Sequence, residues 1–231
     1  MKSFLNDWGL ILTTFLPLVG ALVMLAIPKS SEGAHRTIAL VTSIAAAVVG
    51  VLVMVNFDYD AAGKLQFVVD RSWITLINSR FILGIDGLSL PLFALTLLIV
   101  PLVLIYSWNH IPDPGNPKAF LTLILILETG MLGSFVAQDL ILFFVFFEVV
   151  LLPMYFMIGV WGGPERQYAS IKFFLYTLFG SALMIVSFLS LYFLVKDPST
   201  GEYLRTFDMR ALTASGGAGL ARTAAILIFG G

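Results

Sequence analysis

The sequence has 231 residues, of which 59% are hydrophobic and 12% are charged, and its mean hydropathy is +0.97. So few charges cannot keep the surface of a soluble domain hydrated, and the composition therefore predicts an integral membrane protein. The net charge of −1 argues against nucleic acid as a partner. The sequence contains no cysteine, which excludes disulfides and cysteine-ligated iron–sulfur clusters.

About 20 apolar residues are needed to cross the hydrocarbon core of a bilayer. By this rule the sequence predicts six membrane spans and part of a seventh, which begins near Arg222. The six complete spans are 8–27, 37–55, 88–108, 119–137, 140–161 and 168–195. Because a span cannot stop where this chain does, we expect a fragment that is cut inside its seventh helix. The first apolar run is too long for a removable signal peptide.

The connection over residues 56–87 is long and polar. Its segments KLQFVVD (64–70) and RFILGID (80–86) are rich in β-branched and aromatic residues, which predicts two short strands outside the lipid. Asp86 or Ser89 is placed to cap the helix that follows. Both histidines of the sequence, His35 and His110, fall in predicted loops, and the sequence shows no cluster of metal ligands.

Three ionisable residues, Glu128, Glu148 and Lys172, lie inside predicted spans. Each costs roughly 2.5–3.5 kcal/mol near the bilayer centre, so a function is expected. Glu148 lies about 12 Å from the start of its span, near the midplane of a core about 30 Å thick. Glu128 lies a similar distance before the two-residue turn Gln138–Asp139. A tight antiparallel hairpin at that turn therefore places both carboxyl groups at nearly the same depth.

Two carboxyl groups that face each other inside a membrane cannot both ionise cheaply, and such a pair is a candidate proton-loading site. Lys172 is expected about 8 Å in depth from Glu148, where a direct or water-mediated contact would favour the ionised glutamate. Each residue also has a structural alternative. Glu148 could anchor helix packing by hydrogen bonds, Glu128 could belong to a polar patch near Thr129 and Ser134, and Lys172 could extend to the lipid headgroups.

Three segments carry a resemblance to a known family. FFVFFEVVLLPMYFMIGVWGG (143–163), IKFFLYT (171–177) and LGIDGLSLPLFALT (83–96) closely resemble the antiporter-like M chain (chain 4) of proton-pumping NADH:quinone oxidoreductase, respiratory complex I. The resemblance implies an all-α fold, a polytopic transmembrane helix bundle with two inverted repeats after three N-terminal helices, here truncated within the seventh helix. It implies the three N-terminal helices over 1–118, with the polar loop 56–87, and the start of the first repeat over 119–231.

The resemblance also implies roles for the buried charges. Glu148 matches the family's essential glutamate on the fifth helix, and Lys172 matches a lysine on the sixth. The family's further lysine, on a broken seventh helix, would lie beyond Gly231. Glu128 matches no essential family residue, so its candidate role rests on its depth alone. The implied function is proton translocation through a buried Glu/Lys half-channel, coupled to quinone reduction elsewhere in the complex.

The resemblance implies that this chain binds no cofactor and that NADH, FMN, iron–sulfur clusters and quinone are bound by other subunits. The expected partners are other membrane-arm subunits, including neighbouring antiporter-like chains, and the lipid bilayer. We expect a multi-pass protein of a bacterial cytoplasmic membrane. The distribution of Lys and Arg weakly favours a cytoplasmic N-terminus, whereas the resemblance implies an N-terminus outside the cytoplasm, which we follow.

Two other functions are compatible with the sequence. A cation/proton antiporter complex or a membrane-bound hydrogenase complex uses the same fold for a related subunit. A passive assembly scaffold, in which the buried charges only fix helix packing, is a hypothesis of a different class.

Overall fold

The computed structural model describes residues 2–216. In that part of the chain, six helices are long and apolar enough to cross a membrane. They are Leu5–Ala26, Glu32–Val55, Ser89–Tyr106, Pro117–Val136, Leu140–Trp161 and Arg166–Leu194. The six complete spans predicted from the sequence are therefore confirmed. The predicted seventh span begins near Arg222 and lies outside the described residues.

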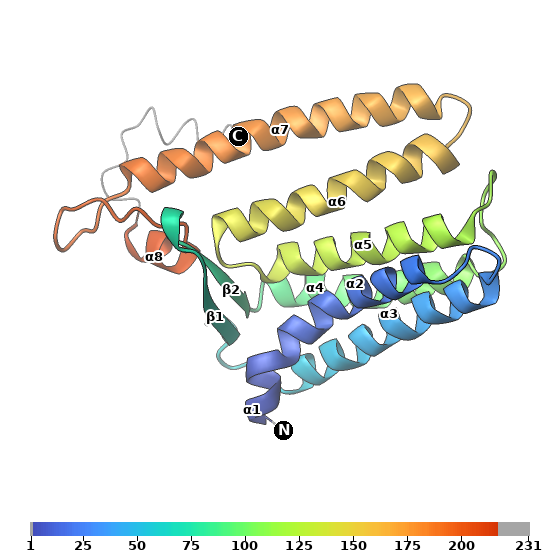
Figure 1. The fold of residues 1–231 in the computed structure, drawn as a ribbon. Helices are drawn as coiled ribbons and strands as arrows, with labels where there is room; N and C mark the ends of the chain where they lie inside the picture. Colours follow the sequence, from blue (N-terminus) through green and yellow to red (C-terminus); the bar gives the residue numbers. More distant parts are fainter. Residues whose placement is uncertain (1, 217–231) are drawn as a thin grey trace.

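The first span combines two helical pieces, η1 (Leu5–Gly9) and α2 (Leu10–Ala26), and the short helix α1 (Lys2–Phe4) precedes it. The other five are α3 (Glu32–Val55), α4 (Ser89–Tyr106), α5 (Pro117–Val136), α6 (Leu140–Trp161) and α7 (Arg166–Leu194). Figure 1 shows these helices side by side, with the strands and α8 (Met209–Ala214) at one end of the bundle and the short loops at the other. Helix α7 lies at the edge, beside α6.

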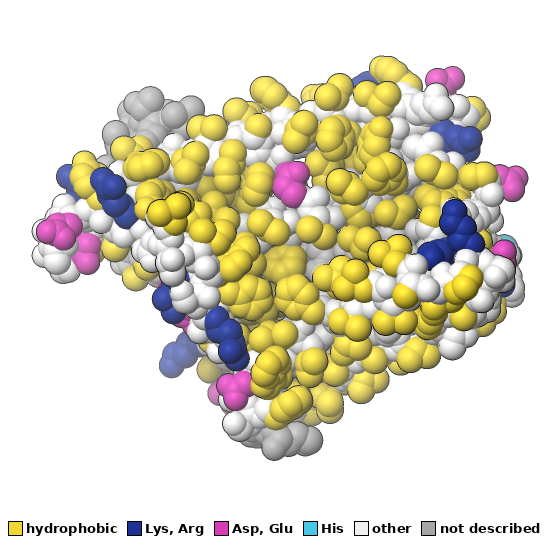
Figure 2. All heavy atoms as spheres, in the orientation of Figure 1, with side chains coloured by type: hydrophobic (Ala, Val, Ile, Leu, Met, Phe, Trp, Pro, Cys, Tyr) yellow, Lys and Arg dark blue, Asp and Glu magenta, His cyan; other side chains and the backbone are white. Residues whose placement is uncertain are grey.

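The outer surface of the bundle is apolar over the length of the helices. Figure 2 shows hydrophobic side chains covering the middle of one face, with Lys, Arg, Asp and Glu gathered mainly toward its two ends. Across the bundle, many hydrophobic side chains are strongly exposed, for example Leu98 of α4 at 60% and Phe179 of α7 at 68%. Such a belt is unstable in water and suits lipid. The chain is a multi-pass integral membrane protein.

Helix α5 occupies the centre of the bundle, where it packs against α2, α3, α4 and α6. Two glycines allow α6 to approach it closely. A Cβ atom added at Gly130 would meet Val150 and the carbonyl of Phe146, and one added at Gly133 would meet the Phe146 ring. The α5–α6 interface therefore runs along Gly130 and Gly133 on one helix and Phe146 and Val150 on the other.

The two strands predicted in the 56–87 connection are confirmed. β1 (Gln66–Ile74) pairs antiparallel with β2 (Ser79–Ile85), with Asp70 opposite Ile82 and Ser72 opposite Arg80, and η2 (Thr75–Ile77) joins them. The hairpin stands at the end of the bundle (Figure 1). The bundle itself remains all-α.

The predicted capping of the third span is also confirmed. The Asp86 carboxylate accepts hydrogen bonds from the backbone N–H groups of Leu88 (3.1 Å) and Ser89 (2.8 Å), and from the Ser89 hydroxyl. Partial burial acts to raise the pKa of Asp86, but these hydrogen bonds outweigh it and hold the pKa below its usual value. Asp86 is therefore a structural residue at the start of α4.

The tight turn predicted between α5 and α6 is confirmed, but it has three residues, 137–139, because α5 ends at Val136. The turn is hydrogen-bonded on both sides. The Gln138 N–H donates to the Ile82 carbonyl of β2 (2.9 Å). On the other side, the Met209 N–H donates to the Gln138 carbonyl (3.0 Å) and the Leu140 N–H donates to the Phe207 carbonyl (2.9 Å). The hairpin and the segment before α8 thus fix the position at which α6 begins.

Candidate functional site

Glu148 lies in the middle of α6, eight residues after Leu140. The start of this helix is well defined because Asp139 caps it, accepting hydrogen bonds from the backbone N–H groups of Ile141 and Leu142. Glu148 is half-buried, and its Oε1 atom is buried without a hydrogen-bond partner. It is the only acidic residue of α6 or α7.

The rotation of α6 directs Glu148 away from α5. Glu148 is two residues, or about 200° of helix rotation, from both Phe146 and Val150, which pack against α5. It is eleven residues from Gly159, which is within about 20° of the same face. Because an added Cβ atom at Gly159 would lie 3.1 Å from the Ser170 hydroxyl of α7, the face that carries Glu148 is the one that contacts α7.

Glu128 is a residue of α5, on the face of that helix opposite to α6, and it is fully buried. Its Oε1 atom accepts a hydrogen bond of 2.8 Å from the Ser43 hydroxyl of α3, whereas its Oε2 atom is buried without a partner. The buried face of α3 that meets it is built mainly from small residues. These are Ala39, Ser43, Ala46 and Gly50.

The two carboxyl groups therefore share a depth but do not meet. Each lies eight residues from the turn, Glu128 before Val136 and Glu148 after Leu140. Glu128 is bonded toward α3, and Glu148 is on the α7 side of α6. No hydrogen bond joins them anywhere in residues 2–216. The facing pair considered from the sequence is not formed in this structure.

Lys172 is exposed on the outer face of α7, and its Nζ atom lies 5.7 Å from the centre of the Tyr168 ring. It is two residues from Ser170, which contacts α6, so its side chain leaves the helix on the opposite side. The antiparallel packing of Gly159 beside Ser170 places Glu148 level with Ser181, about 14 Å along the axis from Lys172. The expected approach of Lys172 to Glu148 is therefore wrong for this structure.

Sequence reasoning missed the burial of His35. It was expected in a loop because the second span was predicted to begin at residue 37, but α3 begins at Glu32 and encloses His35 completely. Neither ring nitrogen has a hydrogen-bond partner. The periodicity of His35, Ala39 and Ser43 along one helix face could have shown this, because residues four apart share a face. His110 does lie outside the helices, after α4.

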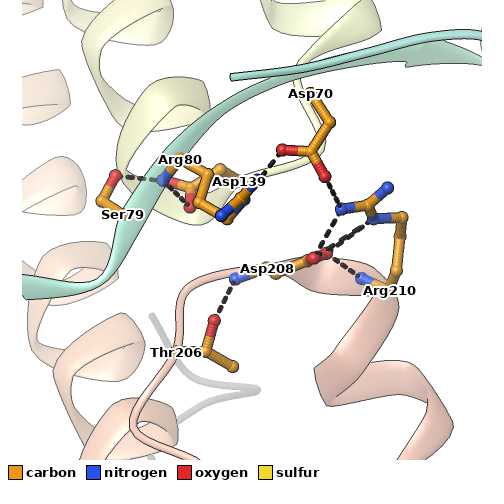
Figure 3. A network of polar contacts seen from close by, with 7 residues as sticks. All are labelled: Asp70, Ser79, Arg80, Asp139, Thr206, Asp208 and Arg210. Atoms are coloured by element: carbon orange, nitrogen blue, oxygen red, sulfur yellow. Dashed lines mark hydrogen bonds and ion pairs between the residues drawn. The ribbon is translucent and has the colours of Figure 1, made fainter. Parts of the chain in front are cut away.

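A network of polar contacts outside the membrane joins the start of α6 to the strands and to α8 (Figure 3). The Asp139 carboxylate accepts hydrogen bonds from the Ser79 hydroxyl (2.9 Å) and the Arg80 N–H (3.0 Å) of β2. Asp70 of β1 forms ion pairs of 2.7 Å with Arg80 and with Arg210 of α8. Arg210 also pairs with Asp208 at 2.7 Å.

This network favours charged side chains at its centre. Partial burial acts to raise the pKa of Asp70, but hydrogen bonds from Arg210 and Arg80 outweigh it and hold the pKa below its usual value. The pKa of Arg210 is raised, first by its hydrogen bonds to Asp208. Through Asp139, the network is connected to the helix that carries Glu148.

Comparison with known families matches nearly the whole chain. Residues 11–134 match the family described as "NADH-ubiquinone oxidoreductase chain 4, amino terminus". Residues 137–227 match the family described as "NADH:quinone oxidoreductase/Mrp antiporter, TM". Together, the membrane-spanning fold and these two matches define an antiporter-like subunit of a membrane complex.

Similar proteins agree with this class. The chain is 40% identical over 183 residues to NADH-quinone oxidoreductase subunit M of Rhodobacter capsulatus, a match that covers 78% of this chain and 35% of that protein. It is 38% identical over 193 residues to NADH-ubiquinone oxidoreductase chain 4 of Arabidopsis thaliana, covering 83% of this chain and 38% of that protein. The chain thus spans a little over a third of the length of these relatives.

A solved structure supports the same assignment. Respiratory complex I from Thermus thermophilus with bound NADH contains a chain that matches with a TM-score of 0.75 and 26% identity, covering 95% of this chain and 41% of that one. The protein belongs to the family of NADH:quinone oxidoreductase chain 4, also called subunit M.

Proposed function

We propose that this chain is a proton-translocating membrane subunit of NADH:quinone oxidoreductase. Its family membership and its six membrane-crossing helices support this function. The observation that carries the proposal is Glu148, a carboxyl group near mid-membrane whose Oε1 atom has no hydrogen-bond partner among the described residues. An ionisable side chain at that depth is costly, and a carboxyl group without a fixed partner is suited to exchange a proton.

We assign separate tasks to the three charged residues of the membrane segments. Glu148 takes up and releases the transported proton on the α7 side of α6. Glu128, held by Ser43, is a second proton-binding group in the interior of the bundle. Lys172 is exposed on the outer face of α7, so we assign it to contacts with whatever polypeptide packs against that face in the complex. In the proposed Glu/Lys half-channel, the two glutamates exchange protons, and Lys172 acts without direct contact with Glu148 in the arrangement described above.

The proposed setting is the membrane arm of respiratory complex I in a bacterial cytoplasmic membrane. Neighbouring antiporter-like subunits are the partners of this chain. NADH, FMN, iron–sulfur clusters and quinone bind to other subunits, so this chain carries protons and not electrons. Within the chain, residues 1–118 form the N-terminal unit and 119–231 begin the first antiporter-like repeat, with the boundary in the first turn of α5.

A subunit of a cation/proton antiporter complex is the second candidate. The family matched by residues 137–227 is described as including the Mrp antiporter as well as the quinone oxidoreductase. This description supports the antiporter as the second candidate. The two candidates differ in their energy source. An oxidoreductase subunit supports proton transport driven by NADH, whereas an antiporter subunit exchanges sodium and protons without an electron donor.

The test uses inside-out membrane vesicles from cells that have or lack the full-length gene. We expect NADH to acidify the vesicles only when the gene is present, and a quinone-site inhibitor to abolish the acidification. Unchanged NADH-driven acidification in the deletion strain, once other NADH dehydrogenases are inhibited, would contradict the proposal. Sodium-dependent proton exchange without NADH would support the antiporter candidate instead.

A further inference from the structure

A cavity of about 470 Å³ lies on the surface of the bundle, where α2 ends and α5 begins. Most of its lining is apolar and comes from three helices, with Leu25 on α2, Leu123 on α5, and Phe156 and Val160 on α6. Leu25 is 57% exposed and Phe156 is 44% exposed, so the cavity is on the outer surface of the described helices. An apolar hollow at this place suits a hydrocarbon chain.

The end of the cavity near the loops carries positive charge. Lys29 and Lys118 both line it, and its lining includes no acidic residue. Within residues 2–216, no ion pair joins Lys29 to a carboxylate. The N-terminus of α5, at Pro117, adds the positive end of a helix dipole. Figure 2 shows Lys and Arg side chains at this end of the bundle, with Asp and Glu side chains also present there.

Lys118 has a fixed position beside the cavity. Its ammonium group donates hydrogen bonds to the carbonyls of Leu25 (2.9 Å) and Ile27 (2.7 Å) at the end of α2. A lysine ammonium has three donors, so one remains for a bound anion. The positive charge is therefore ordered before any ligand arrives.

Thr122 is a second and independent sign of a ligand. It lines the cavity, is only 6% exposed, and its hydroxyl has no hydrogen-bond partner. Thr42, Thr96 and Thr129 donate to the carbonyl four residues earlier. Thr14 of α2 is, like Thr122, buried without a hydrogen-bond partner, but it does not line this cavity. A buried hydroxyl without a partner costs free energy unless another molecule supplies one.

Trp161 fixes the depth of the cavity. Its ring nitrogen donates to the Gly115 carbonyl (2.8 Å), and its side chain lines the cavity at the end of α6. Tryptophan in this position marks the boundary between headgroups and hydrocarbon. Thr122, five residues after Pro117, then lies about 7.5 Å deeper than the start of α5.

We propose that this cavity binds one anionic phospholipid. The phosphate lies between Lys29 and Lys118, the glycerol ester region reaches the Thr122 hydroxyl, and an acyl chain follows the apolar wall of Leu123, Phe156 and Val160. A free inorganic phosphate would leave this apolar wall empty. The lipid would join the ends of α2, α5 and α6, and α6 is the helix that carries Glu148.

The test is photo-crosslinking in the purified complex that contains the full-length chain, embedded in phosphatidylcholine nanodiscs with a trace of photoactivatable phosphatidylglycerol. Peptide mapping should place the label on residues 114–123 and 156–161. Lys29→Gln should reduce this label about fivefold, the factor that corresponds to about 1 kcal/mol for one lysine at an anionic surface. Lys29→Arg should retain the label, because the charge is unchanged.

Two further variants separate the cavity from its charge. Leu123→Trp fills the apolar wall and should also reduce the label, although no charge is changed. Lys64→Gln, at an exposed lysine near the strands, should leave the label unchanged. The proposal is overturned if photoactivatable phosphatidylcholine labels the same peptides equally well. It is also overturned if Lys29→Gln or Leu123→Trp has no effect, or if inorganic phosphate alone displaces the lipid.

Discussion

The carboxyl group of Glu128 depends on a single hydroxyl, that of Ser43. Replacing Ser43 with Ala would leave a fully buried carboxyl group with no partner, which costs about 1–3 kcal/mol. We expect Ser43→Ala to lower the thermal stability of the chain in the purified complex. The measurement is the temperature at which the chain aggregates when samples of the complex are heated. Ser190→Ala is the matched control, because the Ser190 hydroxyl is exposed on α7 and bonds only its own helix. Equal effects of the two variants would contradict this account of Ser43.

The carboxyl group of Glu128 can be replaced by an amide of nearly the same shape. Glu128→Gln keeps an oxygen that accepts from Ser43 but removes the exchangeable carboxyl proton. If Glu128 is the proposed second proton-binding group, this variant should assemble normally and translocate protons more slowly. Proton translocation is measured as dye quenching in vesicles, divided by the amount of assembled complex. A normal rate in Glu128→Gln would show that Glu128 is only structural.

The depth of each carboxyl group could be predicted from the sequence, but the direction of each could not. Depth depends on counting residues from the Gln138–Asp139 turn, and helix geometry makes that count reliable. Direction depends on which residues of α5 and α6 pack together, and that choice is made by Gly130 and Gly133 across the interface. Lys172 was misplaced for the same reason, since its rotation follows from the contact of Ser170 with Gly159.

The α5–α6 hairpin depends on the close approach of its two helices. Gly133→Ala would place a methyl group in the Phe146 ring, and overpacking of this kind costs about 1–3 kcal/mol. We expect a clear loss of thermal stability in this variant. Gly180→Ala is a suitable control, because Gly180 is also helical but has open space around it. A Gly133→Ala variant as stable as the Gly180→Ala variant would contradict the packing described for the hairpin.

The extramembrane network should respond to acid through Asp70. The folded pKa of Asp70 is below its unfolded value of about 3.9, so its stabilising contribution is complete above that pH and is lost as the pH falls through the folded pKa. The protection of the β1 and β2 amides from hydrogen exchange, expressed relative to the intrinsic exchange rate at each pH, should therefore be high at neutral pH and fall on acidification below about pH 4. Asp70→Asn should show the lower protection already at neutral pH.

Asp60→Asn is the control for Asp70→Asn, because it removes a nearby carboxylate that forms no ion pair within residues 2–216. If Asp70→Asn and Asp60→Asn exchanged alike at neutral pH, the ion pairs to Arg80 and Arg210 would not hold the strands. The sequence predicted the two strands from their composition. It did not predict that Asp208 and Arg210 join them, because contacts between distant segments leave no local pattern.

At the scale of the whole molecule, the bundle is unevenly covered. α5 is enclosed by four helices, whereas α7 exposes a row of large apolar residues that includes Ile171, Leu175 and Phe179. The six spans could be predicted because each is a long apolar run, and hydropathy reports that directly. Which helix is central could not be predicted, since all six are strongly apolar and differ mainly in their tertiary contacts.

We propose that Glu148 carries the transported proton, and the proton yield of the assembled complex tests this. The measurement is the number of protons moved per NADH oxidised by reconstituted complexes with wild-type chain, Glu148→Asp or Glu148→Gln, at equal amounts of assembled complex. We expect Glu148→Gln to assemble but to lose coupled proton translocation, and Glu148→Asp to retain part of it because its carboxyl group can still exchange a proton. A wild-type proton yield in assembled Glu148→Gln complexes would contradict the account.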